Sequence, residues 1–252
     1  MKANVTIKAL SAAVLGLAGM AFAGGAMAQC APGGTAGANW PGGQITLGGG
    51  TLSLDSPGLK GTACKAGSAL GASGTSAAAV SDTTPANETR YRFRFYLDAD
   101  LVNTFSGAQI VQLFTANSAN PFPAAGGSVQ MVRAIMIPSG TNKAVRFIVA
   151  TDDSANNNIT TSPSAVLVAG SNWIEGELIV GGAGTGKFNY WVNNNTEGTP
   201  TGTLNVNNSA WVGVDTANLG LAAGNATFRS LNAGKKVYLD EFDSRRTTFI
   251  GQ

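Results

Sequence analysis

The clearest pattern in the chain is a strict alternation of apolar and polar residues between positions 90 and 98. Every second position is large and apolar, namely Tyr91, Phe93, Phe95 and Leu97. Arg92 and Arg94 stand between them. Because successive side chains of a β-strand point to opposite faces, the pattern predicts a long, half-buried strand. We expect its aromatic side to form one wall of the hydrophobic core.

Shorter stretches of the same kind recur along the rest of the chain. Turn-rich segments such as PSGTN and GGAGTG separate them. The sequence ITLGGGTLSLD, residues 45–55, predicts a hairpin that turns at its three glycines. Further strands are expected at residues 77–80, 109–115, 129–137, 144–150, 172–180, 187–192, 211–214, 226–228 and 235–242.

These elements predict an all-β protein. Beyond residue 28, no helical periodicity persists for about ten residues, the usual length of a short helix. Many short strands separated by turns are typical of a β-sandwich. We therefore expect a two-sheet antiparallel sandwich of the jelly-roll type at residues 61–252, preceded by a Gly/Ala-rich segment at residues 29–60.

The first 28 residues have the features of a signal peptide. Lys2 and Lys8 precede an apolar run over residues 9–22, and Ala26-Met27-Ala28 places small residues before a cleavage site. The apolar run is shorter than the about 20 residues that a membrane span requires. We expect cleavage before Gln29, no membrane insertion afterwards, and a secreted, periplasmic or outer-surface location.

The chain has two cysteines, Cys30 and Cys64. In an exported protein such a pair favours one disulfide, and a loop of this length would add about 4 kcal/mol of stability. A redox-active pair is disfavoured because the C-x-x-C spacing is missing. We expect the disulfide to tie the segment at residues 29–60 to the sandwich.

Composition excludes several classes of site. The chain has no histidine, which excludes Ser-His-Asp and Cys-His catalysis, and two cysteines cannot form a Cys₄ zinc site. It has 16 basic and 14 acidic residues, so loss of Lys2 and Lys8 leaves equal numbers of each. That neutrality argues against nucleic acid or a polyanionic glycan as the main partner.

Three segments resemble a known family. SDTTPANETRYRFRFYLDADLV (81–102) and KKVYLDEFDSRRTTFIG (235–251) resemble its first long strand and its final strand. SNWIEGELIVGGAGTGKFNYWVNN (171–194) resembles its central hairpin. The family is a bacterial secreted module of the laminin-G-like, concanavalin A-like jelly rolls. This resemblance implies a fold rather than a function, because the wider superfold includes lectins, glycosidases and adhesion modules.

The best candidate for catalysis is the pair Glu175 and Glu177, whose spacing places both carboxylates on one face of a strand. Retaining glycosidases use two such groups. Laminarinase-type jelly rolls, however, carry a central Asp in E-x-D-x-E, and Gly176 stands between these two glutamates. Alginate-lyase jelly rolls do not serve as a template either, because they typically use a histidine and a tyrosine-rich last strand. The sequence therefore predicts a non-enzymatic protein, with a glycosidase as the less favoured alternative.

A shared polar sheet face is the alternative role of these glutamates. We expect Arg92, Arg94, Glu175, Glu177 and Asp240 to lie on one face, with the first four placed by alternation. Arg133 and Arg146 also occupy polar positions of neighbouring strands, from which they could pair with the glutamates. Such a face is a ligand site if it forms a groove, and a scaffold if it is flat and self-neutralised.

Sugar binding would need an exposed aromatic ring beside hydrogen-bonding groups. Trp191, followed by Asn193, fits that description. The alternative is that Trp173, Trp191 and Trp211 fill the core between the sheets, as aromatic residues usually do. The candidate ligand-binding residues are therefore Arg92, Arg94, Glu175, Glu177, Trp191 and Asn193.

A structural calcium ion is the one cofactor for which the sequence offers ligands. Asp152 and Asp153 lie in a polar loop, and Asp240 and Asp243 lie on the last strand. Carboxylate oxygens suit Ca²⁺, but neither pair follows the EF-hand pattern. For Asp152 and Asp153, a solvated turn is the simpler explanation.

Two functions of different classes follow from the sequence. The first is a secreted or cell-envelope binding module that docks a glycan or a partner protein. The second is a structural surface protein that assembles through sheet edges. The low share of charged residues, 12%, and the 34 glycines favour it. Neither class involves nucleic acid.

We predict that the exported protein begins at Gln29 and contains a Cys30–Cys64 disulfide. Its intact mass should match residues 29–252 less two hydrogens. Two thiols that react after denaturation, or a mass that includes residues 1–28, would contradict this prediction.

Overall fold

The computed structural model describes residues 36, 40–103, 109–118, 129–151, 159–209 and 211–252. The expected signal peptide, residues 1–28, lies outside this part, as do Cys30, Asp152 and Asp153. Among the described residues, no helix is long and apolar enough to cross a membrane.

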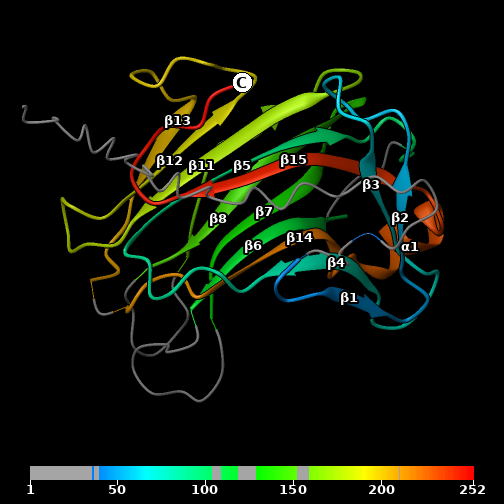
Figure 1. Cartoon of the computed structure of the whole chain (residues 1–252), viewed down its shortest axis with the longest axis horizontal. Coiled ribbons are helices and arrows are strands. Elements are labelled where there is room, and N and C mark those ends of the chain that lie inside the picture. The colour runs from blue at the N-terminus through cyan, green and yellow to red at the C-terminus, as the bar shows by residue number, and fades with distance from the viewer. Residues whose placement is uncertain (1–35, 37–39, 104–108, 119–128, 152–158, 210) are drawn as a thin grey trace, which may run out of the picture.

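Two antiparallel sheets pack face to face, which confirms the predicted all-β sandwich (Figure 1). Sheet A contains, in spatial order, β1 (Gln44–Leu47), β4 (Ala77–Asp82), β14 (Thr216–Ala222), β6 (Val111–Ser118), β7 (Val129–Ser139), β8 (Asn142–Ala150) and β10 (Ala165–Val166), while β9 (Ile159–Thr161) also pairs with β8. Sheet B contains β13 (Gly202–Asn205), β12 (Lys187–Val192), β11 (Asn172–Ile179), β5 (Arg90–Asp98), β15 (Val237–Arg245), β3 (Lys65–Ala69) and β2 (Thr51–Asp55).

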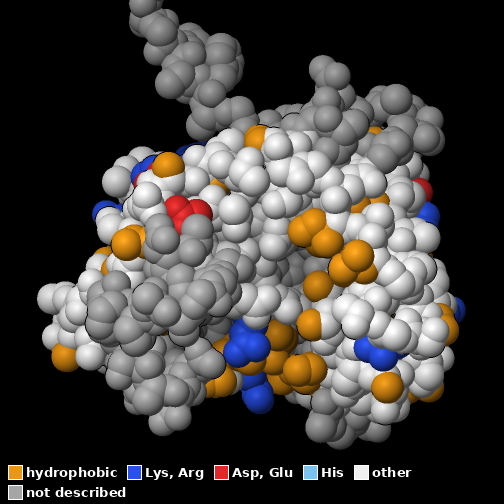
Figure 2. All heavy atoms as spheres, turned by 90° about the horizontal axis from the view of Figure 1, so that it is seen from below, with side chains coloured by type: hydrophobic (Ala, Val, Ile, Leu, Met, Phe, Trp, Pro, Cys, Tyr) orange, Lys and Arg blue, Asp and Glu red, His pale blue; other side chains and the backbone are white. Residues whose placement is uncertain are grey.

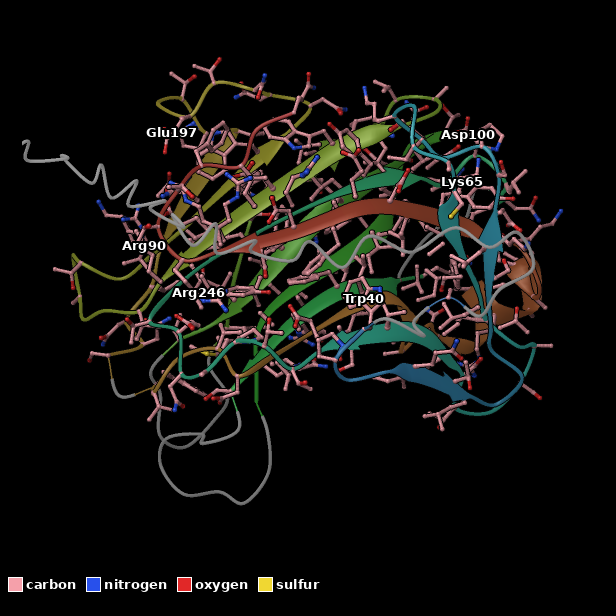
Figure 3. The ribbon with its side chains drawn as sticks, in the orientation of Figure 1. Trp40, Lys65, Arg90, Asp100, Glu197 and Arg246 are labelled. Carbon is pink, nitrogen blue, oxygen red and sulfur yellow. The ribbon has the colours of Figure 1, made fainter. Side chains whose placement is uncertain are left out.

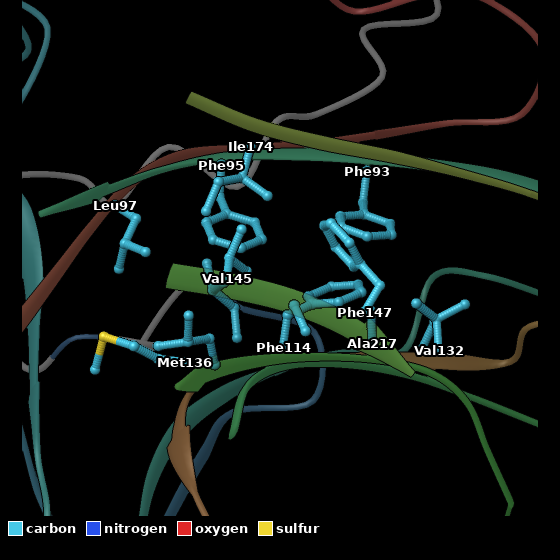
Figure 4. Packing of buried hydrophobic residues seen from close by; sticks show 14 of the residues in the cluster. Phe93, Phe95, Leu97, Phe114, Val132, Met136, Val145, Phe147, Ile174 and Ala217 are labelled. Atoms are coloured by element: carbon cyan, nitrogen blue, oxygen red, sulfur yellow. The ribbon is translucent and has the colours of Figure 1, made fainter. Parts of the chain in front are cut away.

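The alternating segment forms β5 at the centre of sheet B, and its apolar side faces the core as expected. Tyr91, Phe93, Phe95 and Leu97 are all fully buried. Phe93 stacks on Phe114 of sheet A with ring centroids 4.0 Å apart. Figure 4 shows rings from β5 meeting Phe114 and Phe147 between the two sheets.

Residues 44–55 form two strands that do not pair with each other, so the predicted hairpin is wrong. β1 pairs with β4 in sheet A, whereas β2 pairs with β3 in sheet B. The glycines between them carry the chain from one sheet to the other. A Cβ at Gly48 would lie 1.9 Å from the Thr75 carbonyl oxygen, so the crossing requires a residue without a side chain.

Two predictions near the C-terminal end are also corrected. Residues 226–228 belong to the helix α1 (Ala226–Asn232), whose first turn is capped by Asn225 because its side chain accepts a hydrogen bond from Phe228 N at 2.8 Å. Residues 211–214 contain one isolated bridge, Glu88 to Val214, and the strand there is β14. The small residues of β14 hid its pattern, since they pack against the alanines of β4.

Cys64 is buried beside Leu54 and Ala36, at the start of β3. Because Cys30 lies outside the described residues, the disulfide stays a prediction. The division between residues 29–60 and 61–252 also stays a prediction. Within the first of these ranges, β1 and β2 already belong to the two sheets.

We predict that Phe93→Ala lowers the free energy of unfolding by about 3–5 kcal/mol, because it removes a large ring from the centre of the core. Chemical denaturation measures the loss. Thr248→Ala, a change at an exposed position, is the control and should change stability by less than about 0.5 kcal/mol. A loss below about 1 kcal/mol for Phe93→Ala would contradict the packing.

Candidate functional site

The outer face of sheet B carries the residues that the sequence grouped together. In the register of β5 with β11, Glu175 lies opposite Arg94 and Glu177 opposite Arg92. Asp240 of β15 lies opposite Tyr96, on the same face. A bulge follows between Asp240 and Asp243, which shifts the alternation of β15 and explains why its phase was ambiguous in the sequence.

Glu177 is the centre of a buried ion-pair network. Its Oε1 accepts hydrogen bonds from Arg90 Nε at 2.7 Å and Arg92 Nε at 2.8 Å, and its Oε2 accepts one from Asn189 Nδ2 at 3.1 Å. Arg92 also pairs with Glu197 at 3.1 Å. Figure 3 shows Arg90 and Glu197 at the same end of sheet B. Burial raises the pKa of Glu177, but the hydrogen bonds from Arg92, Asn189 and Arg90 outweigh it, and the net pKa is lowered.

Glu175, two residues away, has a different environment. It is fully buried, and its two oxygens accept hydrogen bonds from the backbone N–H groups of Ile250 and Gly251, both at 3.1 Å. Burial raises its pKa, and the two backbone donors only partly oppose this effect. The two glutamates therefore share a strand face, but their pKa values are shifted in opposite directions.

Gly176 stands between the glutamates for a packing reason. It faces the core opposite Phe93, and a Cβ there would lie 2.4 Å from the Phe93 ring. A larger residue cannot occupy this position without moving the ring. The aromatic layer below therefore requires glycine between the two glutamates.

Trp191 and Trp173 lie outside the main core, although both are buried. Together with Tyr96 they form a separate cluster on the outer face of sheet B, against which Leu59 and Phe249 pack. The expectation that they fill the core is correct for Trp211 alone. Trp191 Nε1 donates to the Thr196 carbonyl at 3.0 Å, so its indole is held in place.

Asn193 supports the turn after β12. It has a positive φ of 53°, its Oδ1 accepts from Trp173 N at 2.8 Å, and its Nδ2 donates to Asn172 Oδ1 at 2.9 Å. These bonds hold the end of β12 beside the start of β11. A sugar-binding role for Trp191 and Asn193 stays a prediction.

The carboxylates proposed for calcium have other partners where they are described. Asp240 accepts hydrogen bonds from Leu59 N and Thr62 Oγ1, and Asp243 pairs with Arg245 at 2.9 Å. The described residues contain no cluster of three potential metal ligands. Calcium binding at Asp152 and Asp153 stays a prediction.

The outer face of sheet A has a different character. The strand registers align a row of outward residues across five strands, namely Ser81, Asn218, Thr115, Arg133 and Ile148. Asn218 Nδ2 and Asn117 Nδ2 both donate to Thr115 Oγ1 at 3.3 Å. Beside this row lies an aliphatic cluster of Ile135, Ile137, Ala144 and Ile148.

Arg133 is half-buried in this row and has no ion-pair or hydrogen-bond partner among the described residues. Burial lowers the pKa of its guanidinium.

Arg146 lies on the same face and donates to Ser164 Oγ at 2.9 Å. In the described strands of sheet A, no outward position holds an acidic residue. Figure 2 looks onto this side of the molecule, where blue basic and orange apolar side chains gather near the middle.

Sequence reasoning placed Arg133 and Arg146 beside the glutamates, which is wrong because they belong to the opposite sheet. It did not identify Thr115, Asn117 or Asn218 as candidate site residues. The sequence does contain one signal for this face. Arg133 interrupts an otherwise apolar run, residues 131–137, and a charged residue inside such a run is rare in a strand that only packs in a core.

Comparison with known proteins finds solved structures with a similar fold. No protein-family model matches the chain, and a search of curated proteins finds no match. Among solved structures, the endo-β-1,4-glucuronan lyase from Trichoderma reesei has a TM-score of 0.60 at 16% identity, over 86% of this chain and 94% of that one. The alginate lyase Aly36B has a TM-score of 0.56 at 10% identity, over 88% and 96%. The cellulose-induced protein Cip1 has a TM-score of 0.53 at 16% identity, over 82% and 90%.

These similarities correct the expectation of a non-enzymatic protein. That expectation rested on the missing histidine and the incomplete glutamate motif, yet the same sandwich occurs in two polysaccharide lyases. Rejecting alginate lyases as a template concerned their catalytic residues, which a similarity of fold does not test. A concanavalin A-like β-sandwich is consistent with these neighbours, and the narrower laminin-G-like assignment stays a prediction.

We predict that Glu177→Gln lowers the free energy of unfolding by about 3 kcal/mol at neutral pH, because it removes the buried charge partner of Arg92 and leaves it only the exposed Glu197. Glu177 has a lowered pKa in the fold, so its stabilisation exists above the ordinary glutamate pKa and disappears as the pH falls through the lowered value. In urea denaturation, the difference from the unaltered chain should shrink as the pH falls from about 7 to about 3.

Glu175→Gln is the matched control on the same strand face. The raised pKa of Glu175 means that the folded chain holds this proton more tightly than the unfolded chain does. The unaltered chain therefore loses stability as the pH rises through that pKa, and the variant does not. The same pH dependence in both variants would contradict this assignment.

Proposed function

We propose that the outer face of sheet A binds an acidic polysaccharide, with Arg133 holding a uronate carboxylate. The observation that carries this proposal is a half-buried arginine without an ion-pair partner, on a face whose described strands carry no outward acidic residue. A guanidinium matches a carboxylate with two parallel hydrogen bonds. Because Arg133 is already partly desolvated, such a pair would be stronger than one at the open surface.

The rest of the face suits a sugar chain. Asn218, which is partly exposed, offers an amide group to sugar hydroxyls and is held by the buried Thr115, while Ile148, the partly exposed member of the aliphatic cluster, offers an apolar surface to the ring. Sites for small ligands usually combine an apolar lining with a few fixed polar groups. Net neutrality does not oppose this partner, since the acidic residues Glu175, Glu177 and Glu241 lie on the opposite sheet.

Lyase cleavage of such a chain is the second candidate function. Pairing a uronate carboxylate with Arg133 would make the neighbouring carbon-bound proton more acidic, which is the first requirement of β-elimination. The neighbours named as glucuronan lyase and alginate lyase favour this candidate. Export through the expected signal peptide would bring the protein to polysaccharides outside the cytoplasm.

We predict that Arg133→Ala weakens binding of polyglucuronate or alginate about 10- to 100-fold, the loss expected for a charged hydrogen-bonded pair. Calorimetric titration measures the affinity. Lys187→Ala removes an equal charge from an exposed position on sheet B and should leave the affinity unchanged. Arg133→Lys should recover only part of the binding, since lysine lacks the planar fork.

The same polymers test the second candidate through the ultraviolet absorbance of the unsaturated product. Product formation that Arg133→Ala abolishes would support lyase activity at this face. Equal affinity of Arg133→Ala and the unaltered chain for both polymers would contradict the proposed site.

A further inference from the structure

The last residues of the chain, Arg246–Gln252, form what we call the C-terminal strap. After β15 ends, the strap turns back over the outer face of sheet B towards β12 and β13 (Figure 1). Phe249 makes edge contacts with Trp173 of β11 and Trp191 of β12, with ring centroids 6.1 and 5.3 Å apart. The guanidinium of Arg92 lies 5.6 Å from the Phe249 ring.

Arg246, the first residue of the strap, pairs with Glu88 through its Nε at 2.7 Å, and few other bonds fasten the strap. Backbone N–H groups of Ile250 and Gly251 donate to Glu175, and that of Gln252 donates to Asn195 Oδ1 at 3.0 Å. Arg245 donates to the Phe249 carbonyl at 3.3 Å. Thr247 and Thr248, which join Arg246 to the part of the strap that covers the face, are exposed. The strap can therefore leave the face without breaking a sheet hydrogen bond of β15.

The surface under the strap has the composition of a ligand site. Trp173 and Trp191 offer two indole rings, and Glu175 offers a carboxylate that now accepts two N–H donors. Trp173 is 1% exposed, and its Nε1 has no hydrogen-bond partner; Arg94 Nε beside it is also buried without one. The strap therefore covers this face without satisfying its polar groups. A buried donor without a hydrogen bond costs folding free energy.

An oligosaccharide would satisfy them better than the strap does. Its hydroxyl and ring oxygens can accept from Trp173 Nε1 and Arg94 Nε, and its hydroxyl groups can donate to Glu175 as the two backbone groups do now. The guanidinium groups on this face are already paired, Arg92 with Glu177 and Arg94 with Glu241 at 3.0 Å, so none is free for an anionic sugar. Charge complementarity therefore favours a neutral sugar chain, in contrast to sheet A.

We propose that the C-terminal strap occupies a second carbohydrate site, specific for a neutral oligosaccharide, and that ligand binding requires the strap to be released. The strap acts as an intramolecular competitor, so the apparent affinity of the site equals its intrinsic affinity multiplied by the fraction of molecules in which the strap is open. This site is independent of Arg133 and of the function proposed for sheet A.

The test weakens the strap in the full chain. Phe249→Ala removes its aromatic contact, and Thr248→Ala changes an exposed strap residue that makes none. With cellohexaose and mannohexaose as probes, tryptophan fluorescence and calorimetry should show at least about tenfold tighter binding of one probe by Phe249→Ala than by Thr248→Ala or the unaltered chain. A synthetic peptide of residues 246–252 should compete with the sugar.

Two further measurements keep the proposal open to disproof. Adding Trp191→Ala to Phe249→Ala should abolish the gained binding, and retained binding would place the sugar elsewhere and overturn the proposal. In the unaltered chain, saturating oligosaccharide should speed hydrogen exchange at the Ile250 and Gly251 amides. Circular dichroism checks that Phe249→Ala folds. The proposal is wrong if the folded variant binds neither sugar, whether or not it binds the peptide. It is also wrong if hydrogen exchange at the two amides is unchanged.

Discussion

A layer of aromatic rings between the two sheets determines how the rest of the molecule is arranged. Phe93 and Phe95 of β5 meet Phe114 of β6, and Phe188 of β12 meets Phe147 of β8 at 5.1 Å. Because these rings must point inward, the residues between them must point outward, and β5 thereby presents Arg90, Arg92 and Arg94 on the far side of sheet B. The same layer requires glycine at position 176, which leaves Glu175 and Glu177 on that outer face.

The two outer faces differ in whether their arginines have carboxylate partners. On sheet B, every described arginine of β5 has a carboxylate partner, and the C-terminal strap closes over Glu175 and the two tryptophans. On sheet A, Arg133 lies among amides, a hydroxyl and aliphatic side chains with no carboxylate beside it in the described strands. A chain with almost no net charge can therefore still present a basic face, because Glu177 and Glu241 lie on sheet B, where they pair with its arginines.

Glu175 and Glu177 show that spacing alone does not assign chemistry. Both lie on one strand face, yet guanidinium and amide donors lower the pKa of Glu177, whereas burial under the strap raises that of Glu175. Opposed pKa shifts are typical of acid–base pairs in active sites. Here the strap covers one member and an ion-pair network engages the other, so the pair supports the fold and the closed face in the described conformation.

Local periodicity in the sequence determined the strands β5, β7, β8, β11 and β12, and for β5 it also determined the side that faces the core. It also placed Arg92, Arg94, Glu175 and Glu177 on one face, since alternation and side-chain direction are properties of a single strand. Sheet membership was decided only by the tertiary structure. The glycines at residues 48–50 send β1 and β2 to different sheets, and Arg133 lies on the sheet opposite the glutamates. The bulge in β15 and the strap over Glu175 are likewise invisible to periodicity. The physical reason is that strand pairing and tail packing join residues far apart in the chain, whereas a periodic pattern reports only which side of its own strand a residue occupies.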